Sequence, residues 1–169
     1  IPVPERIVDL YTSSSGNALS RHSFGRQMRN IYDVMACRDL LSTNVISADY
    51  GGWDHHRSMM DNIEPKIRDL FGNNKGLATL RNELQQHQPG AAERLIFLVY
   101  GEFGRQLAAN GDYGTDHGEG NYAILIGDRV NGGAYGDMFP VSELPRFAQR
   151  GSDIAGLTAY DRVMGRICE

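Results

Sequence analysis

The sequence predicts an α/β fold, with a mainly parallel sheet flanked by helices, from two observations. Stretches with apolar residues three or four apart, typical of amphipathic helices, alternate with short β-prone runs. In addition, residues 95–100 are apolar at every position, as expected of a strand that helices cover on both faces. Because 169 residues suffice for one ordinary core, we expect a single domain spanning residues 1–169.

The helical pattern covers four segments and the strand pattern three. Pro65 falls inside the second helical segment, which suits a proline in a first turn if Asn62 caps a fresh helix start. Residues 132–152 are rich in Gly, Pro and aromatic residues and predict a loop with at most one hairpin. The expected helices are residues 20–42, 59–70, 77–84 and 157–167, and the expected strands are 45–48, 95–100 and 122–126.

Composition excludes several classes of function. The net charge of −4 and the scattered basic residues argue against nucleic-acid binding, which needs clustered Lys and Arg. No apolar run approaches the roughly 18 residues that cross a bilayer. Cys37 and Cys168 lie far apart, so neither a thiolate metal site nor a Cys-x-x-Cys redox motif is expected. The N-terminus resembles an internal cut, without an initiator Met or a signal peptide.

Three glycine-flanked polar clusters follow or lie beside the predicted strands, where open α/β sheets bind ligands. Asp54 and His56 are two residues apart, so in an extended segment both side chains face one ion. Glu102 follows the apolar strand, and Arg105 beside it would orient a metal carboxylate or clamp an anionic ester. The sequence thus predicts a buried divalent-metal site, of which this chain supplies half.

The third cluster, Asp116-His117, lies between Gly114 and Gly118, which permit the sharp turn that aims adjacent residues at one ion. Carboxylate and imidazole ligands without thiolate favour zinc, manganese or iron, and we expect zinc or manganese. The predicted metal ligands are Asp54, His56, Glu102, Asp116 and His117, with Arg105 as the catalytic residue.

Structural alternatives exist for each cluster. An isolated Asp-x-His is more often an exposed turn, Glu102 and Arg105 can form an ordinary salt bridge, and Asp116 can cap a turn. The metal hypothesis is favoured because three of the five histidines share this glycine-flanked context. We interpret the other two histidines as surface residues, and Trp53 and Phe103 as packing residues beneath the site.

At Gly-Gly-Trp-Asp-His-His (51–56), Gly-Glu-Phe-Gly-Arg (101–105) and Gly-Thr-Asp-His-Gly (114–118) the chain resembles the bacterial family of domain of unknown function 1501, grouped with the alkaline phosphatase and sulfatase superfamily. The resemblance extends from about Ser20 to residues 160–162 and matches the C-terminal part of a typical member. It implies an alkaline phosphatase-like fold, of which this chain is a portion that lacks the N-terminal strand and the nucleophile region.

The resemblance also implies roles for individual residues. Asp54 and His56 resemble the superfamily's Asp and His ligands after one strand, although the usual gap is longer. Glu102 stands where phosphomutases and sulfatases carry an Asp-His pair, and His117 resembles their later histidine. Family members usually carry a twin-arginine export signal, which implies a periplasmic or exported location.

The functional hypothesis is a metal-dependent hydrolase of phosphate or sulfate esters, with a small anionic ester as its partner. The alternative is an exported, non-catalytic α/β protein that keeps a remnant metal or ligand site. A third, lower-ranked hypothesis has glycine-rich loops that bind a carbohydrate or a protein. The sequence names neither the substrate nor the oligomeric state.

Overall fold

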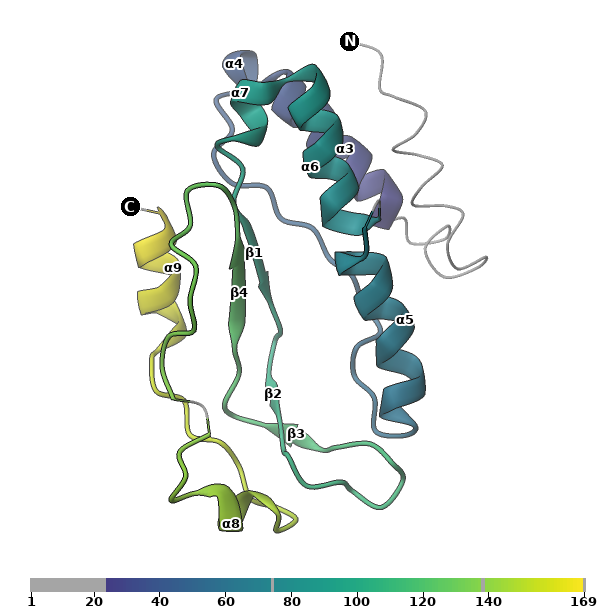
Figure 1. Cartoon of the computed structure of the whole chain (residues 1–169), viewed down its shortest axis with the longest axis vertical. Helices are drawn as coiled ribbons and strands as arrows, with labels where there is room; N and C mark the ends of the chain where they lie inside the picture. The colour runs from purple at the N-terminus through teal and green to yellow at the C-terminus, as the bar shows by residue number, and fades with distance from the viewer. Residues whose placement is uncertain (1–23, 74, 138, 169) are drawn as a thin grey trace. The chain divides into compact units, whose positions relative to one another are not determined.

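The computed structural model describes residues 24–73, 75–137 and 139–168. Figure 1 shows the helices and strands of these ranges. The helices are α3 (Phe24–Ala36), α4 (Arg38–Leu41), α5 (Met59–Phe71), α6 (Gly76–His87), α7 (Pro89–Ala92), α8 (Leu144–Phe147) and α9 (Tyr160–Cys168). The strands are β1 (Phe97–Tyr100), β2 (Gly104–Arg105), β3 (His117–Gly118) and β4 (Ala123–Ile126).

The described residues divide into two compact units. The helical unit comprises residues 24–53, Ile63–Phe97 and Gly127–Arg129. The hairpin unit comprises Asp54–Asn62, Leu98–Ile126 and, in the C-terminal part, residues 130–168. The expectation of a single domain stays a prediction.

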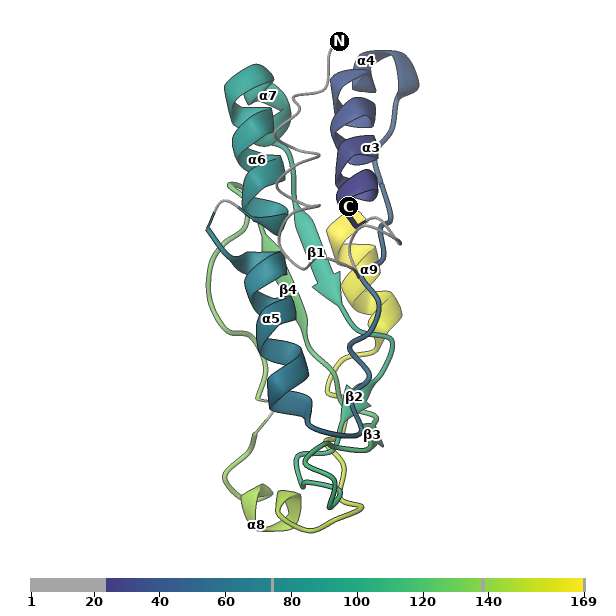
Figure 2. The ribbon, with the colours of Figure 1, turned by 90° about the vertical axis from the view of Figure 1, so that its right-hand side faces the viewer.

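The core of the helical unit is formed by α3, α6 and α7. Figures 1 and 2 show α3 beside α6, and the two helices contact each other. The apolar stripe of α3 is buried, with Met28 and Tyr32 only 2% and 1% exposed. Leu80 and Leu84 of α6 are fully buried, as the spacing predicted. In the first helical segment the spacing correctly predicted burial of Phe24, Met28 and Ile31, but Leu41 is 55% exposed and the fully buried Tyr32 lies outside the predicted stripe.

Two helix predictions need correction. The first helical segment is divided at Cys37 into α3 and α4, and it ends at Ser42 in the left-handed region (φ 49°). Residues 20–23 of that prediction lie outside the described part of the chain. The prediction that a new helix starts at Asn62 is wrong, because α5 begins at Met59 and runs through Pro65. The side-chain amide of Asn62 instead donates to the Ser58 carbonyl at 2.8 Å. Pro65 removes one backbone donor, yet α5 continues to Phe71.

The mainly parallel sheet is wrong for the described residues, which form two small antiparallel sheets. β1 pairs with β4, as Figure 1 shows, and β2 pairs with β3. Residues 45–48 form no strand and are exposed, because a β-prone run becomes a strand only where it finds a partner. β1 is only half-buried, and Tyr100 is 50% exposed, so the apolar run predicted a strand but not its coverage.

The C-terminal tail differs slightly from its prediction. Residues 132–152 contain the short helix α8, and no hairpin forms in their described part. The last helix begins at Tyr160, three residues later than expected. None of the helices in the described ranges combines the length and apolar character that crossing a membrane requires.

Candidate metal centre

A short hairpin and a neighbouring extended segment position the candidate site, all within the hairpin unit. β2 and β3 pair antiparallel, with Arg105 opposite His117. The segment that carries Asp54 and His56 runs beside the loop between these strands, through an isolated bridge between Arg57 and Tyr113. The Met59 amide also donates to the Tyr113 carbonyl at 2.9 Å.

Gly114 permits this close approach of the two segments. A Cβ atom at position 114 would lie 2.2 Å from the His56 carbonyl carbon, far inside any ordinary contact. A residue with a side chain would therefore push the His56 backbone away from the loop. Gly114 thus lies in a bend, as its sequence context predicts, and its lack of a side chain is a second requirement of the site.

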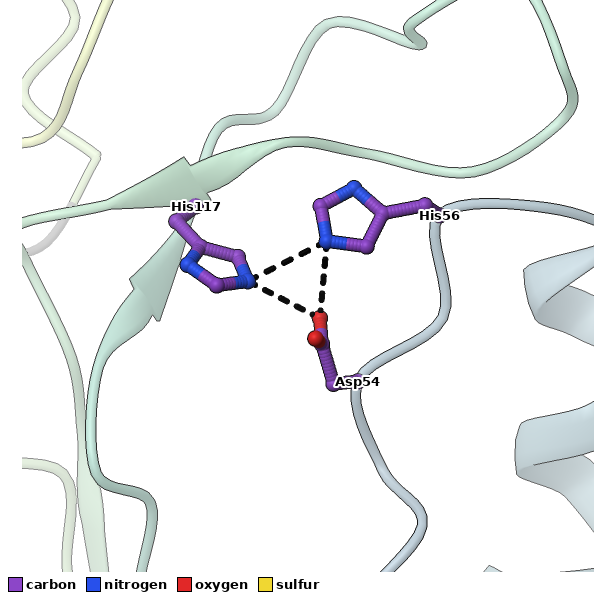
Figure 3. A group of neighbouring side chains, drawn as sticks. All are labelled: Asp54, His56 and His117. Atoms are coloured by element: carbon purple, nitrogen blue, oxygen red, sulfur yellow. Dashed lines mark hydrogen bonds and ion pairs between the residues drawn. The ribbon is translucent and has the colours of Figure 1, made fainter.

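Asp54, His56 and His117 converge on one point, as Figure 3 shows. The Asp54 Oδ1 atom lies 3.1 Å from His56 Nε2 and 3.0 Å from His117 Nε2. The two imidazole nitrogens are 3.1 Å apart. The three potential ligand atoms thus form a nearly equilateral triangle, contributed by two segments about sixty residues apart in sequence.

The triangle has the dimensions that a transition-metal ion requires. Donors about 2.0–2.1 Å from one ion lie about 2.9–3.4 Å apart for coordination angles between octahedral and tetrahedral. The observed separations of 3.0–3.1 Å fall in this range. Two imidazoles and one carboxylate are also a donor set that zinc and manganese accept.

Asp116 lies behind His56, on the ring edge opposite the triangle. Its Oδ1 atom is 3.4 Å from His56 Nδ1, whereas His56 Nε2 faces Asp54 and His117. A proton on Nδ1 that points to a carboxylate leaves the Nε2 lone pair free for an ion. The hydrogen bond from Asn110 lowers the pKa of Asp116, desolvation opposes this, and His56 and Arg150 add to the lowering. Asp116 therefore stays ionised and suited to this role.

Arg105 holds Asp54 in place and is occupied by protein acceptors. Its Nη1 atom donates to Asp54 Oδ1, and its Nη2 atom donates to the carbonyls of His55 at 2.7 Å and Thr115 at 2.5 Å. Its Nε atom donates to Thr115 Oγ1 at 3.0 Å. Desolvation would raise the pKa of Asp54, but hydrogen bonds from Arg105 and His117 and the nearby imidazoles hold it below its ordinary value. Of the two roles expected for Arg105, these contacts fit the orientation of a metal carboxylate rather than the clamping of an anionic ester.

The His117 ring is fixed by an aromatic neighbour and its backbone by a glutamine. Phe103 stacks on the imidazole with ring centroids 3.8 Å apart, as expected of a packing residue beneath the site. Gln106 donates to the His117 carbonyl through its side chain at 3.1 Å and to the Asp116 carbonyl through its backbone at 3.0 Å. Trp53 belongs to the helical unit, where it packs edge-on against Tyr50.

The structure brings together three of the five predicted metal ligands. Asp116 joins them indirectly through His56, while Glu102 is exposed and is not a member of the triangle. The prediction of a buried site is wrong for the described residues, because the side chains of Asp54, His56 and His117 are 47%, 44% and 47% exposed. The three lie on segments at the surface of the hairpin unit, whose carboxylate and imidazole groups remain open to water.

Sequence reasoning missed the polar residues that support the ligands, above all Asn110. The Asn110 amide donates to the His56 carbonyl at 2.9 Å and to Asp116 Oδ1 at 3.2 Å. Its sequence signal, Asn-Gly at 110–111, indicates only a turn. Nothing in the local pattern indicated that this turn contacts the segment around His56.

Comparison with known proteins identifies the family. The family described as "Protein of unknown function (DUF1501)" matches residues 13–146. No curated protein and no solved structure matches the chain. Since the matched span covers most of the sequence and includes all three polar clusters, the chain belongs to the DUF1501 family.

Proposed function

We propose that this chain binds one divalent transition-metal ion through Asp54, His56 and His117 and belongs to a metal-dependent hydrolase of phosphate or sulfate esters. The observation that carries the proposal is the triangle of ligand atoms with sides of 3.0–3.1 Å. Random surface residues do not usually place two imidazole nitrogens and a carboxylate oxygen in mutual contact, because each pair gains little from it in water.

The surroundings of the triangle support a catalytic rather than a structural ion. Three protein ligands leave at least one coordination position open, which is the arrangement of catalytic zinc sites. Nearly half of each ligand side chain is exposed, so a small substrate can reach the position. When bound, zinc or manganese would supply Lewis-acid polarisation of an ester oxygen. Arg105 and Asp116 would keep Asp54 and His56 in their binding geometry.

Two further parts of the proposal rest on the resemblance of the three glycine-flanked motifs. The first is a place in the alkaline phosphatase and sulfatase superfamily, with its α/β fold. The second is a periplasmic or exported location, with a small anionic ester as the substrate. Separating the periplasmic and cytoplasmic fractions of cells that express the natural gene, with a marker enzyme for each compartment, tests the location.

Metal binding is tested first, by titrating metal-free protein with Zn²⁺ or Mn²⁺ in a calorimeter and by elemental analysis after dialysis. We expect one ion per chain in the wild type and a loss of at least about 100-fold in affinity in His117→Ala, which lacks a ligand. The matched control is His87→Ala, because His87 lies on α6 in the helical unit, where its imidazole pairs with Glu83 at 3.6 Å. Wild-type protein without a stoichiometric ion, or equal binding by both variants, would refute the metal site.

Hydrolysis is tested on the full-length protein with aryl phosphate and aryl sulfate esters and added zinc or manganese. Turnover that disappears in His117→Ala supports the hydrolase. The alternative is a non-catalytic exported protein with a remnant site, and one observation favours it: the Arg105 guanidinium is engaged by Asp54, His55 and Thr115. Stoichiometric metal without turnover on either ester would decide for this alternative.

A further inference from the structure

The side chain of Asn110 connects the two segments that supply the proposed metal ligands. Its Oδ1 atom accepts from the backbone amides of Asp112 at 3.0 Å and Gly114 at 3.4 Å. Its Nδ2 atom donates to the His56 carbonyl at 2.9 Å and to Asp116 Oδ1 at 3.2 Å. These four contacts also fix the orientation of the amide, since a flipped side chain would face donors with donors and acceptors with acceptors.

The two ends of this amide therefore act on different structures. The oxygen closes the turn of residues 110–114, which is the ordinary local role of an asparagine. The nitrogen contacts the His56 backbone and the carboxylate behind the His56 ring. A loop-forming asparagine needs only the first set of contacts, so the second set requires another explanation.

We propose that Asn110 is a positioning residue that aims His56 Nε2 at the metal ion. One hydrogen bond fixes the backbone from which the His56 ring projects, and the other fixes the Asp116 carboxylate that faces Nδ1 of the same ring. Rotation of the imidazole is thereby restricted at both ends. The inference rests on the proposed metal site and assigns to this residue part of its pre-organisation.

Asn110→Asp separates the two roles of the side chain. The aspartate keeps a carboxylate oxygen for the two turn amides, but it places a second oxygen where Nδ2 was, against two acceptors. Because that oxygen cannot donate, the His56 carbonyl and Asp116 lose their shared donor. The turn survives the substitution, and the support of His56 does not.

The chain offers a matched control in the hairpin unit. Asn121 donates from Nδ2 to the Gly101 carbonyl at 2.9 Å, and its Oδ1 accepts from the Tyr122 amide at 2.8 Å. The chemistry resembles that of Asn110, but neither of these contacts involves a metal-site residue. Asn121→Asp therefore reports the effect of the same substitution on folding alone.

The experiment measures zinc affinity by calorimetry and the melting temperature of the metal-free protein for wild type, N110D and N121D. We expect zinc affinity to fall about 10-fold or more in N110D and to stay within about twofold in N121D, since removing the partner of a ligand typically costs 10- to 100-fold. The His56 ring ¹⁵N signals of the metal-free protein should differ from wild type in N110D only. Asn110→Ser keeps a turn-forming oxygen on a shorter side chain and should reproduce the loss.

A double-mutant cycle with Asp116→Asn tests the route of the effect. If Asn110 acts partly through Asp116, the loss in the double variant is smaller than the product of the two single losses. Equal zinc affinity in wild type and N110D, or equal losses in N110D and N121D, would overturn the inference while leaving the metal site intact. Wild-type protein that binds no zinc would instead refute the proposed function itself.

Discussion

Replacing Gly114 by alanine should separate the two segments that build the site. The added Cβ atom would lie 2.2 Å from the His56 carbonyl carbon, 2.3 Å from the His56 oxygen and 2.7 Å from the Arg57 nitrogen. Since ordinary contacts begin near 3.4 Å, the two backbones must move apart by about 1.2 Å. All three neighbours are backbone atoms, so no flexible side chain can absorb this movement.

The magnitude of the effect follows from the tolerance of a metal site. Metal–ligand distances vary by only about 0.2 Å, so a displacement of about 1 Å removes His56 from the triangle. We expect zinc affinity to fall at least about 100-fold, which corresponds to about 2.7 kcal/mol. Overpacking should also cost about 1–3 kcal/mol of folding free energy, or about 2–12 °C in melting temperature for a chain of this size.

Calorimetric zinc titration and a thermal melt of the metal-free protein measure both effects. Gly156→Ala is the control, because Gly156 lies in the same unit and a Cβ there meets nothing within 4 Å. Zinc affinity in Gly114→Ala equal to that of Gly156→Ala would show that the close approach of Gly114 and His56 does not hold the site together.

Three further results are expected. Arg105→Lys should lower the free energy of unfolding in urea by about 1–3 kcal/mol, because an ammonium cannot reproduce the fork of hydrogen bonds to Asp54, His55 and Thr115. Arg57→Lys is the control, because the Arg57 side chain is 83% exposed. Equal losses of stability in the two variants would contradict the role of the fork. Phe103→Leu should weaken zinc binding by up to about 10-fold, since loss of the stack on His117 removes about 0.5–1.5 kcal/mol; an unchanged titration would show that the stack does not hold the ring. Burial, with a smaller contribution from Asp69, raises the pKa of Tyr50 to about 12, so the phenol ionises later in the folded than in the unfolded chain. The stabilising contribution of Tyr50 is therefore complete below pH 10 and declines between pH 10 and 12. Urea unfolding at these pH values should show wild type losing stability relative to Tyr50→Phe. If the stabilities of the two proteins change in parallel with pH, the raised pKa is excluded.

The helical core could be predicted from sequence because its signal is local. The three-and-four spacing of apolar residues within each helix indicates which face is apolar, and Met28 of α3 and Leu80 and Leu84 of α6 are buried. The sheets could not be predicted, because pairing depends on partners far along the chain. Residues 45–48 and 97–100 are similar in β-propensity, but only the second run found a partner, β4.

The candidate site was predicted in its chemistry and only partly in its geometry. The i, i+2 spacing of Asp54 and His56 predicted that both face one ligand, and their side chains do converge with His117. Adjacent residues Asp116 and His117 were both expected to be ligands, but neighbours on an extended backbone point in opposite directions. His117 therefore reaches the triangle while Asp116 lies behind His56. Contacts such as that of Asn110 with His56 join residues 54 positions apart and leave no local pattern.

The pairing of Arg105 with His117 sets a rule for how this protein can change during evolution or design. Lengthening the turn at residues 107–109 would leave the alternation of side chains along β3 untouched. Inserting one residue between Gly114 and Asp116, by contrast, would move the aspartate into the place of the histidine, so an acidic group would replace the imidazole in the triangle. Insertions should therefore accumulate on one side of this hairpin tip and be excluded from the other.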